Sequence, residues 1–229
     1  MTMLIVAAAA FLALHLLVAG TKARDTIVGV VGEGPYLGLF SLASAAGLTW
    51  LIFAFGGARH DPANQIYWTV AWATRIPVVG LVAIAFLFAV PGLLTNSPTR
   101  VRGDSVVDRP NAATGMTRIT RHPFLWGVVI WAAAHLIANG GSADLILFGG
   151  LMLLALVGTC SIDAKRMRAL GERYAAFKAE TSNIPFAAIL QGRQSLKLSE
   201  IWWRLLVGVA VWALILWVHP RAFGGNPLG

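Results

Sequence analysis

The sequence is poor in charge and in cysteine, and each shortage excludes a class of protein. Only 12% of its 229 residues are charged, whereas soluble domains carry about 25%. With 57% hydrophobic residues and a mean hydropathy of +0.71, the chain is predicted to be a polytopic membrane protein with one compact bundle. The single cysteine, Cys160, excludes an internal disulfide and any Cys-x-x-Cys motif that would hold a metal or attach a haem covalently.

Motifs of the common hydrolases and nucleotide-binding enzymes are also missing. The sequence has no serine elbow, no His-Glu-x-x-His motif, no P-loop and no pair of carboxylates within one apolar run. The net charge of +8 does not indicate nucleic-acid binding, because the basic residues stand between apolar runs, where they face a membrane surface. We therefore expect the lipid bilayer as a partner and no nucleic acid.

Six apolar runs come close to the roughly 20 residues that a helix needs to cross the hydrocarbon. The first run lacks the basic n-region and the clear cleavage site of a signal peptide, and further runs follow it, so we expect it to be a mature helix. The chain is therefore predicted to form one all-α transmembrane bundle over residues 1–229. The six predicted spans cover 3–20, 34–56, 74–94, 122–139, 143–161 and 200–218.

Basic residues are concentrated in the loops after the first, third and fifth runs. By the positive-inside rule these three loops lie in the cytoplasm and both termini lie outside. The cytoplasmic loops hold Lys22 and Arg24, then Arg100, Arg102, Arg109, Arg118 and Arg121, then Lys165, Arg166, Arg168, Arg173, Lys178, Arg193 and Lys197.

The segment 163–180, DAKRMRALGERYAAFKAE, is predicted to be an amphipathic cytoplasmic helix. Met167, Leu170, Tyr174 and Phe177 recur at helical spacing with basic residues between them. Such a helix packs on the bundle at the membrane surface; closing a ligand cavity is the alternative role.

Three histidines are candidate ligands. His15 stands in MLIVAAAAFLALHLLVAG and His135 in FLWGVVIWAAAHLIANG, while His122 in TRHPF begins the second of these runs. Ionisable side chains are costly in hydrocarbon and usually face a bundle interior, a cavity or a cofactor. Two intramembrane imidazoles that approach each other can hold a haem without covalent attachment.

Each histidine also has a simpler interpretation. His135 can hydrogen-bond across helices, and His15 can reach lipid headgroups. His122 can simply precede a helix, because proline favours the first helical position. At about 1.5 Å per residue, the α carbons of His15 and His135 differ in depth by about 10 Å. A haem lying flat in the membrane accepts that offset, and a His15/His122 pair stays open.

Haem carboxylates need cationic partners near a membrane surface. Arg118 and Arg121 are the candidates if the haem edge points to the cytoplasm, and Arg75 is the candidate if it points outward. Each of the two cytoplasmic arginines can equally follow from the positive-inside rule.

Five segments of the chain together carry a family resemblance. They are GEGPYLGLFSLAS at 32–44, ITRHPFLWG at 119–127, WAAAHLIANG at 131–140, TSNIPFAAILQGR at 181–193 and HPRAFG at 219–224. With them the chain resembles the NnrU family, whose members are bacterial integral membrane proteins associated with denitrification. The family also includes the zeta-carotene isomerase (Z-ISO) of plants and cyanobacteria, a haem b enzyme that isomerises a cis double bond. The resemblance implies non-covalent haem b held by His15 and His135, with His122 nearby, in a bacterial inner membrane. It implies a redox-linked or isomerase-like role.

A second resemblance leads to a rival hypothesis. RHPFLWG, followed later by LGERYAAFKAETSNIPF, is similar to the C-terminal half of isoprenylcysteine and phospholipid methyltransferases. That similarity implies S-adenosylmethionine held by Arg121 and His122, under a cover shaped by Tyr174 and Phe177. The chain departs from the pattern at 161–163, where Ser-Ile-Asp replaces the usual Glu-Glu pair. A non-enzymatic membrane assembly factor is the third hypothesis.

Overall fold

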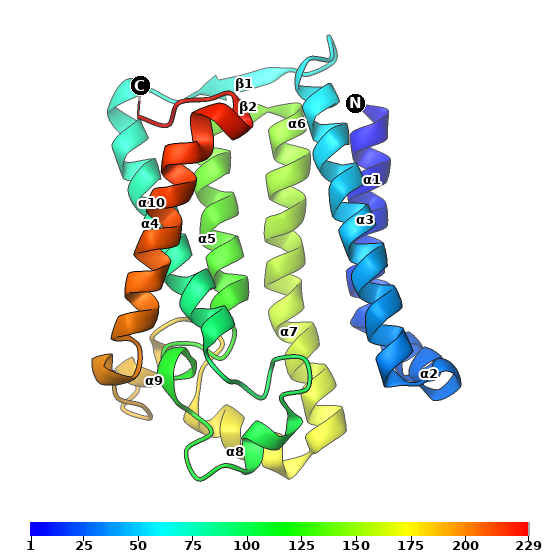
Figure 1. Cartoon of the computed structure of the whole chain (residues 1–229), viewed down its shortest axis with the longest axis vertical. Coiled ribbons are helices and arrows are strands. Elements are labelled where there is room, and N and C mark those ends of the chain that lie inside the picture. Colours follow the sequence, from blue (N-terminus) through cyan, green and yellow to red (C-terminus); the bar gives the residue numbers. More distant parts are fainter. Residues whose placement is uncertain (229) are drawn as a thin grey trace.

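The computed structural model describes residues 1–228 and is almost entirely helical (Figure 1). Five helices of this part of the chain are long and apolar enough to cross a membrane, and α5 is a shorter apolar helix of 16 residues. The predicted all-α membrane bundle is therefore confirmed, and six long helices correspond to the six predicted spans. They are α1 (Thr2–Ala13, extended by a π-helical turn over Leu14–Ala19), α3 (Glu33–Arg59), α4 (Trp72–Leu94), α5 (Pro123–Ala138), α7 (Gly150–Leu170) and α10 (Trp202–Phe223).

The short elements divide between the two ends of the bundle (Figure 1). One end carries both termini, a ribbon of two antiparallel strands and α6 (Ser142–Asp144), which leads through a π-helical turn over Leu145–Gly149 into α7. The other end carries three short helices. The strands are β1 (Ile66–Thr69) and β2 (Asn139–Gly141), and the helices are α2 (Lys22–Val31), α8 (Glu172–Glu180) and α9 (Ala187–Leu190).

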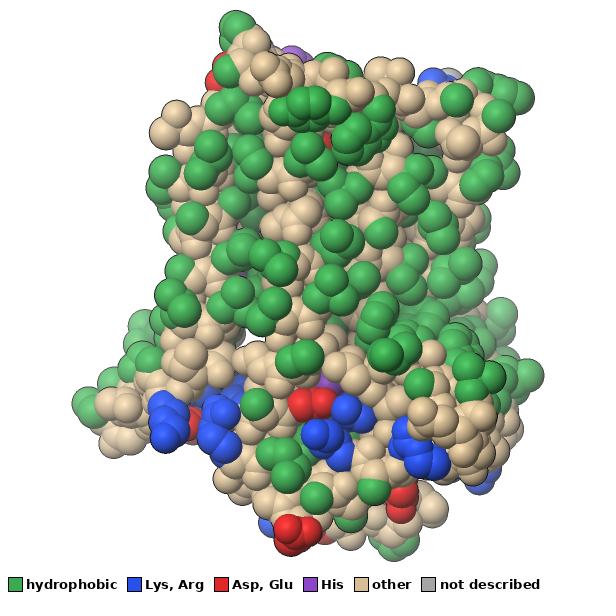
Figure 2. All heavy atoms as spheres, turned by 180° about the vertical axis from the view of Figure 1, so that it is seen from behind, with side chains coloured by type: hydrophobic (Ala, Val, Ile, Leu, Met, Phe, Trp, Pro, Cys, Tyr) green, Lys and Arg blue, Asp and Glu red, His purple; other side chains and the backbone are tan. Residues whose placement is uncertain are grey.

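Lysine and arginine side chains gather at the end that carries α2 and α8 (Figure 2). The termini lie at the opposite end, as the distribution of basic residues predicts. Within the bundle, α1 packs on α3, α5 packs between α4 and α7, and α10 packs on α4.

The fifth predicted span ends too early. The helix runs continuously from Ser142 to Leu170, nine residues beyond the predicted end at 161. The apolar pattern stops where Asp163, Lys165 and Arg166 begin, but these residues continue the helix outside the apolar region. A change in hydropathy thus marks the edge of the membrane-compatible segment and not the end of the helix.

The segment expected to form one amphipathic helix over 163–180 is divided at Gly171. Residues up to Leu170 belong to α7, and α8 begins at Glu172. Gly171 has φ +54°, a backbone conformation that glycine adopts without the steric cost of a Cβ. Tyr174 and Phe177 pack against Ala112 and Ala113. The apolar face of α8 is therefore covered by the loop before α5.

The ribbon of β1 and β2 was not expected from the sequence. Ile66 pairs with Gly141 and Thr69 pairs with Asn139. A Cβ on Gly140 would lie 2.3 Å from the backbone oxygen of Trp68, so the two strands approach closely only because this position is glycine. The ribbon connects the start of α4 to the end of α5.

Small residues allow α4 and α5 to pack closely. A Cβ added to Gly127 would lie 2.7 Å from the backbone nitrogen of Ala89, and one added to Gly92 would lie 2.7 Å from the nitrogen of Phe124. Close approach of backbones at small residues is a common source of helix association in membranes. The contact holds α5, and with it the position of His135, against α4.

Candidate functional site

His15 lies in the π-helical turn that follows α1 and is half-buried against α3. Its Nδ1 is 2.9 Å from the backbone oxygen of Phe11, and its Nε2 is 3.3 Å from Oγ of Ser44. A carbonyl oxygen can only accept, so Nδ1 carries the proton and a neutral His15 has its lone pair on Nε2. Short π-helical turns often occur at functional sites.

His135 has the same arrangement on α5. Its Nδ1 is 2.8 Å from the backbone oxygen of Trp131, while Nε2 has no hydrogen bond within residues 1–228. The ring stacks on Phe148 with centroids 4.8 Å apart, and the centroid of Trp131 is 4.5 Å away. A neutral imidazole that donates through Nδ1 and keeps Nε2 free is the usual form of a metal-ligating histidine.

Along the axis of the bundle, the imidazole rings of His15 and His135 point toward each other. Each Nδ1 contacts the carbonyl four residues earlier, so each ring points toward the start of its own helix, and α1 and α5 run in opposite directions (Figure 1). From the end that carries the termini, His15 is about 20 Å deep and His135 about 5 Å deep at 1.5 Å per residue. The resulting offset of about 15 Å is of the same order as the sequence suggested.

His15 and His135 border one apolar cluster. Phe11 beside His15 belongs to it, as do Phe148 and Trp131 beside His135. In the part of the chain that the structure describes, the two rings share no hydrogen bond or ring contact. The donor chemistry of both imidazoles would suit two ligands of a haem iron, and the apolar cluster would give that haem a dry environment.

His122 lies in a different part of the molecule. It is 3% exposed at the position before Pro123, which begins α5 as the helix-start interpretation predicts. Thirteen residues along the chain place it about 20 Å from His135. Its Nε2 is 2.8 Å from Oδ1 of Asp163, and among the described residues it makes no contact with His15. Asp163 thus occupies Nε2 of His122, and the His15/His122 pair stays a prediction.

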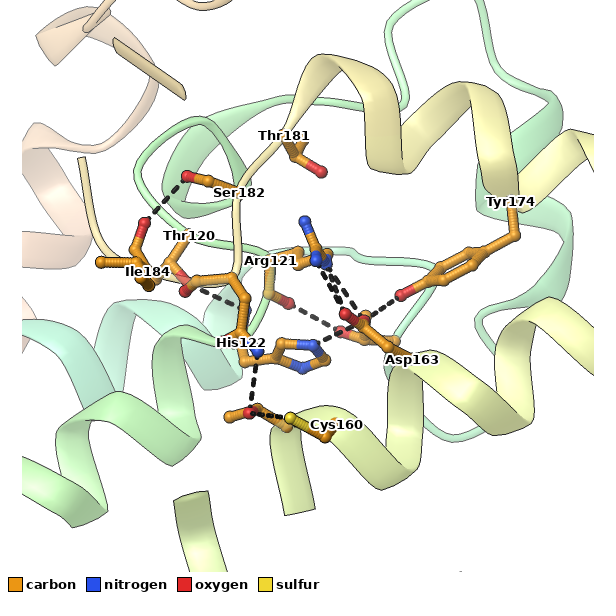
Figure 3. Close-up of polar contacts among 12 residues, drawn as sticks. Thr120, Arg121, His122, Cys160, Asp163, Tyr174, Thr181, Ser182 and Ile184 are labelled. Atoms are coloured by element: carbon orange, nitrogen blue, oxygen red, sulfur yellow. Dashed lines mark hydrogen bonds and ion pairs between the residues drawn. The ribbon is translucent and has the colours of Figure 1, made fainter. Parts of the chain in front are cut away.

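Asp163 organises a buried polar network around Arg121 and His122 (Figure 3). Nε and Nη2 of Arg121 lie 2.9 and 2.7 Å from Oδ2 of Asp163, and the hydroxyl of Tyr174 donates to Oδ1 at 2.7 Å. The backbone nitrogen of Arg121 donates to the oxygen of Ser182 at 3.0 Å. The network thus ties the start of α5 to α7, to α8 and to the segment after α8.

Burial controls the protonation of this network. Burial lowers the pKa of His122, and the hydrogen bond to Asp163 offsets only part of that effect. Burial and the same carboxylate raise the pKa of Tyr174. At neutral pH His122 is therefore neutral and Tyr174 is protonated, so both donate to Asp163, and Arg121 and Asp163 form the only charged pair among these four side chains.

Sequence reasoning missed Asp163. A single acid directly after an apolar run was the available signal, because such a residue is tolerated near hydrocarbon only with a partner. Glu200 was missed in the same way: its Oε2 is 2.9 Å and its Oε1 3.1 Å from nitrogens of Arg118. Two of the three arginines proposed as partners for haem carboxylates, Arg118 and Arg121, are therefore already paired with acids of this chain.

The fold defines a multi-pass membrane protein that carries two histidines, His15 and His135, within its apolar helices. The chain belongs to the NnrU family: the family model described as "NnrU protein" matches residues 3–227. It is also 34% identical over 178 residues to "15-cis-zeta-carotene isomerase, chloroplastic" of Zea mays, and 30% identical over 178 residues to the protein of that name from Arabidopsis thaliana. Each match covers 76% of this chain and 47% of the relative, so the chain spans about half the length of the curated relatives it matches. No solved structure matches the chain.

Proposed function

We propose that this protein is a membrane isomerase that binds haem b without covalent attachment through His15 and His135. We propose that it acts on a cis double bond of a lipophilic polyene. The observation that carries the proposal is the 34% identity to a 15-cis-zeta-carotene isomerase over 76% of the chain. The free Nε2 of His135 and the tautomer of His15 support the haem part.

The residues of the chain would hold and protect such a cofactor. Backbone carbonyls of Phe11 and Trp131 orient the two imidazoles, and stacking on Phe148 limits rotation of the His135 ring. The apolar side chains of the cluster would keep water away from a haem held by the two rings. A bound haem b would supply a redox-active iron that can polarise an electron-rich double bond. A polyene would reach the haem from the bilayer.

The haem part is tested by the visible spectrum of the purified protein in mild detergent, oxidised and then reduced with dithionite. We expect a Soret band with sharp reduced α and β bands that is lost or shifted in His15→Ala and in His135→Ala. His60→Ala is the matched control, because His60 ends α3 and is exposed. A protein that stays colourless after expression with a haem precursor would overturn this part.

The isomerase part is tested separately. Protein with a confirmed haem spectrum is incubated under reducing conditions with a 15-cis carotene in detergent micelles, and the isomers are separated by chromatography. Conversion that depends on His15 and His135 supports the proposal. A haem-loaded protein that leaves the isomer ratio of several cis-polyenes unchanged contradicts the isomerase role and leaves the haem site standing.

A denitrification-linked role is the second proposal, because the family model covers residues 3–227 whereas the isomerase match covers only 178 residues. Here the protein would lie in a bacterial inner membrane and support respiratory enzymes, with or without catalysis of its own. Growth on nitrate after gene deletion tests this role, and normal denitrification would contradict it. The methyltransferase hypothesis gains no support from the comparisons, because both curated relatives that match the chain are named as isomerases.

A further inference from the structure

A cavity of about 310 Å³ opens beside the Arg121–Asp163 pair, at the end of the bundle that carries the basic loops. The end of α8, the segment 181–184 and α9 surround it. Three cationic residues line it, Arg121, Lys178 and Arg193, and among the described residues of its lining there is no aspartate or glutamate. The cavity is therefore suited to an anion.

Arg121 presents an unused nitrogen to this cavity. The residue is 7% exposed, and its Nε and Nη2 are bound to Asp163. Within residues 1–228, Nη1 has no hydrogen-bond partner, and Figure 3 shows the guanidinium nitrogen that is not joined to Asp163 on the side of Thr181. Nη1 is not among the buried atoms of the described residues that lack a partner, so it is open to the solvent of the cavity and can donate to a ligand there. Asp163 thus holds the guanidinium in place with one donor left for a ligand.

The other two cations keep their charge available. Nη1 of Arg193 donates to the backbone oxygens of Ala179 and Thr181, at 2.5 and 2.8 Å. Carbonyl oxygens orient the guanidinium without neutralising it. Lys178 forms no ion pair with the described residues and lies exposed at the end of α8. One buried and two exposed cations therefore converge on one small cavity.

The lining of the cavity is mostly polar, but exposed apolar side chains in it and next to it form part of its rim. Ile184, which lines the cavity, is 64% exposed, and Leu190 at the end of α9 is 86% exposed. Large exposed apolar side chains next to cations are typical of a surface that meets both the hydrocarbon and the headgroups of a bilayer. Basic pockets at the cytoplasmic face of membrane proteins bind phosphate headgroups, and arginine matches the geometry of phosphate oxygens.

We propose that this cavity is a binding site for a phosphate ester, with Arg121, Lys178 and Arg193 as its cationic ligands. The apolar part of the rim favours the headgroup of an anionic phospholipid as the source of the phosphate. This site is independent of the intramembrane histidines, and its occupancy does not require haem.

The test uses the full chain in a neutral detergent, with binding followed by calorimetry and native mass spectrometry. The probes are short-chain phosphatidylglycerol, short-chain phosphatidylcholine and inorganic phosphate. We expect one tight site for phosphatidylglycerol, with phosphatidylcholine at least about tenfold weaker because its headgroup carries no net charge. Lys178→Gln and Arg193→Gln should each weaken phosphatidylglycerol binding about fivefold.

Lys22→Gln is the matched control, because Lys22 is an exposed cation of α2 outside the cavity. It should leave the affinity within about twofold. The unfolding transition of each variant, measured without lipid, shows whether its fold is intact.

A second outcome is saturable binding of inorganic phosphate, with the same dependence on Lys178 and Arg193 but with no preference for phosphatidylglycerol. That result supports the phosphate site with a soluble ligand. Equal binding of the two lipids without phosphate binding, or an equal loss in Lys22→Gln, overturns the proposal.

Discussion

Arg121 and Asp163, 42 positions apart in the chain, form a buried ion pair in which Nη2 and Oδ2 are 2.7 Å apart. The pair joins the start of α5 to the part of α7 that lies at the end of the bundle with the basic loops. A buried charge is stable only when it is paired and hydrogen-bonded, and Asp163 completes its shell with His122 and Tyr174. The same pair orients Arg121 beside the cationic cavity.

Asp163→Asn should destabilise the protein strongly. The substitution keeps the shape of the side chain but leaves the Arg121 guanidinium buried without a counter-charge, which costs about 3–5 kcal/mol. Denaturant unfolding in detergent micelles, followed by tryptophan fluorescence, measures the change. Asp108→Asn is the control: Asp108 pairs with Arg173 on the surface, where an ion pair is worth about 0–1 kcal/mol. Equal losses in the free energy of unfolding would show that the buried Arg121–Asp163 pair stabilises the protein no more than the surface pair does.

Tyr174→Phe should cost about 1.5–3 kcal/mol, because it removes one buried hydrogen bond to a charged acceptor without changing the shape of the ring. The same unfolding assay applies. Tyr67→Phe, whose exposed hydroxyl lies 3.4 Å from Oγ of Ser142, should change stability by less than about 0.5 kcal/mol. A Tyr174→Phe variant as stable as the parent would argue that water replaces the hydroxyl.

The stability of the fold should fall in mild acid through His122. Burial lowers the pKa of His122 in the folded protein, while in the unfolded chain it titrates near pH 6.5. Below about pH 6.5 the unfolded chain therefore binds a proton that the folded protein does not, so the contribution is fully present above pH 6.5 and is lost toward the lower folded pKa. As the pH is lowered from 8 to 5, the thermal unfolding midpoint should fall less steeply in His122→Asn than in the parent. Parallel pH profiles would rule out this contribution.

Gly127→Ala should weaken the contact between α4 and α5. The new Cβ would lie 2.7 Å from the backbone nitrogen of Ala89, and accommodating it costs about 1–3 kcal/mol. Gly80→Ala in α4 is the control, since its Cβ would meet nothing within 4 Å. It should be neutral or slightly stabilising, because alanine favours the helix. The unfolding midpoints of Gly127→Ala and Gly80→Ala are measured in detergent. A Gly127→Ala variant as stable as the parent would mean that α4 and α5 move apart with little loss of stability.

The five membrane-compatible helices and the shorter apolar helix α5 could be predicted from the sequence, because a long apolar run has one stable form in hydrocarbon. The position of His122 before α5 followed from Pro123 in the same way. The division at Gly171 could not be predicted, because the spacing of Met167 and Tyr174 continues through it as if the helix were unbroken. The ribbon of β1 and β2 could not be predicted either, since it depends on two loops 70 residues apart.

By itself the sequence determined the class of the protein, its helices and the common side of its basic loops, because these depend on local composition and on the cost of placing charge in hydrocarbon. It also singled out His15 and His135 as unusual residues in apolar runs. Only the tertiary structure decided which groups meet. It assigned Asp163 to Arg121, separated His122 from the intramembrane histidines, and gathered three cations around one cavity. Such pairings depend on how helices distant in sequence pack, and no local pattern encodes that packing.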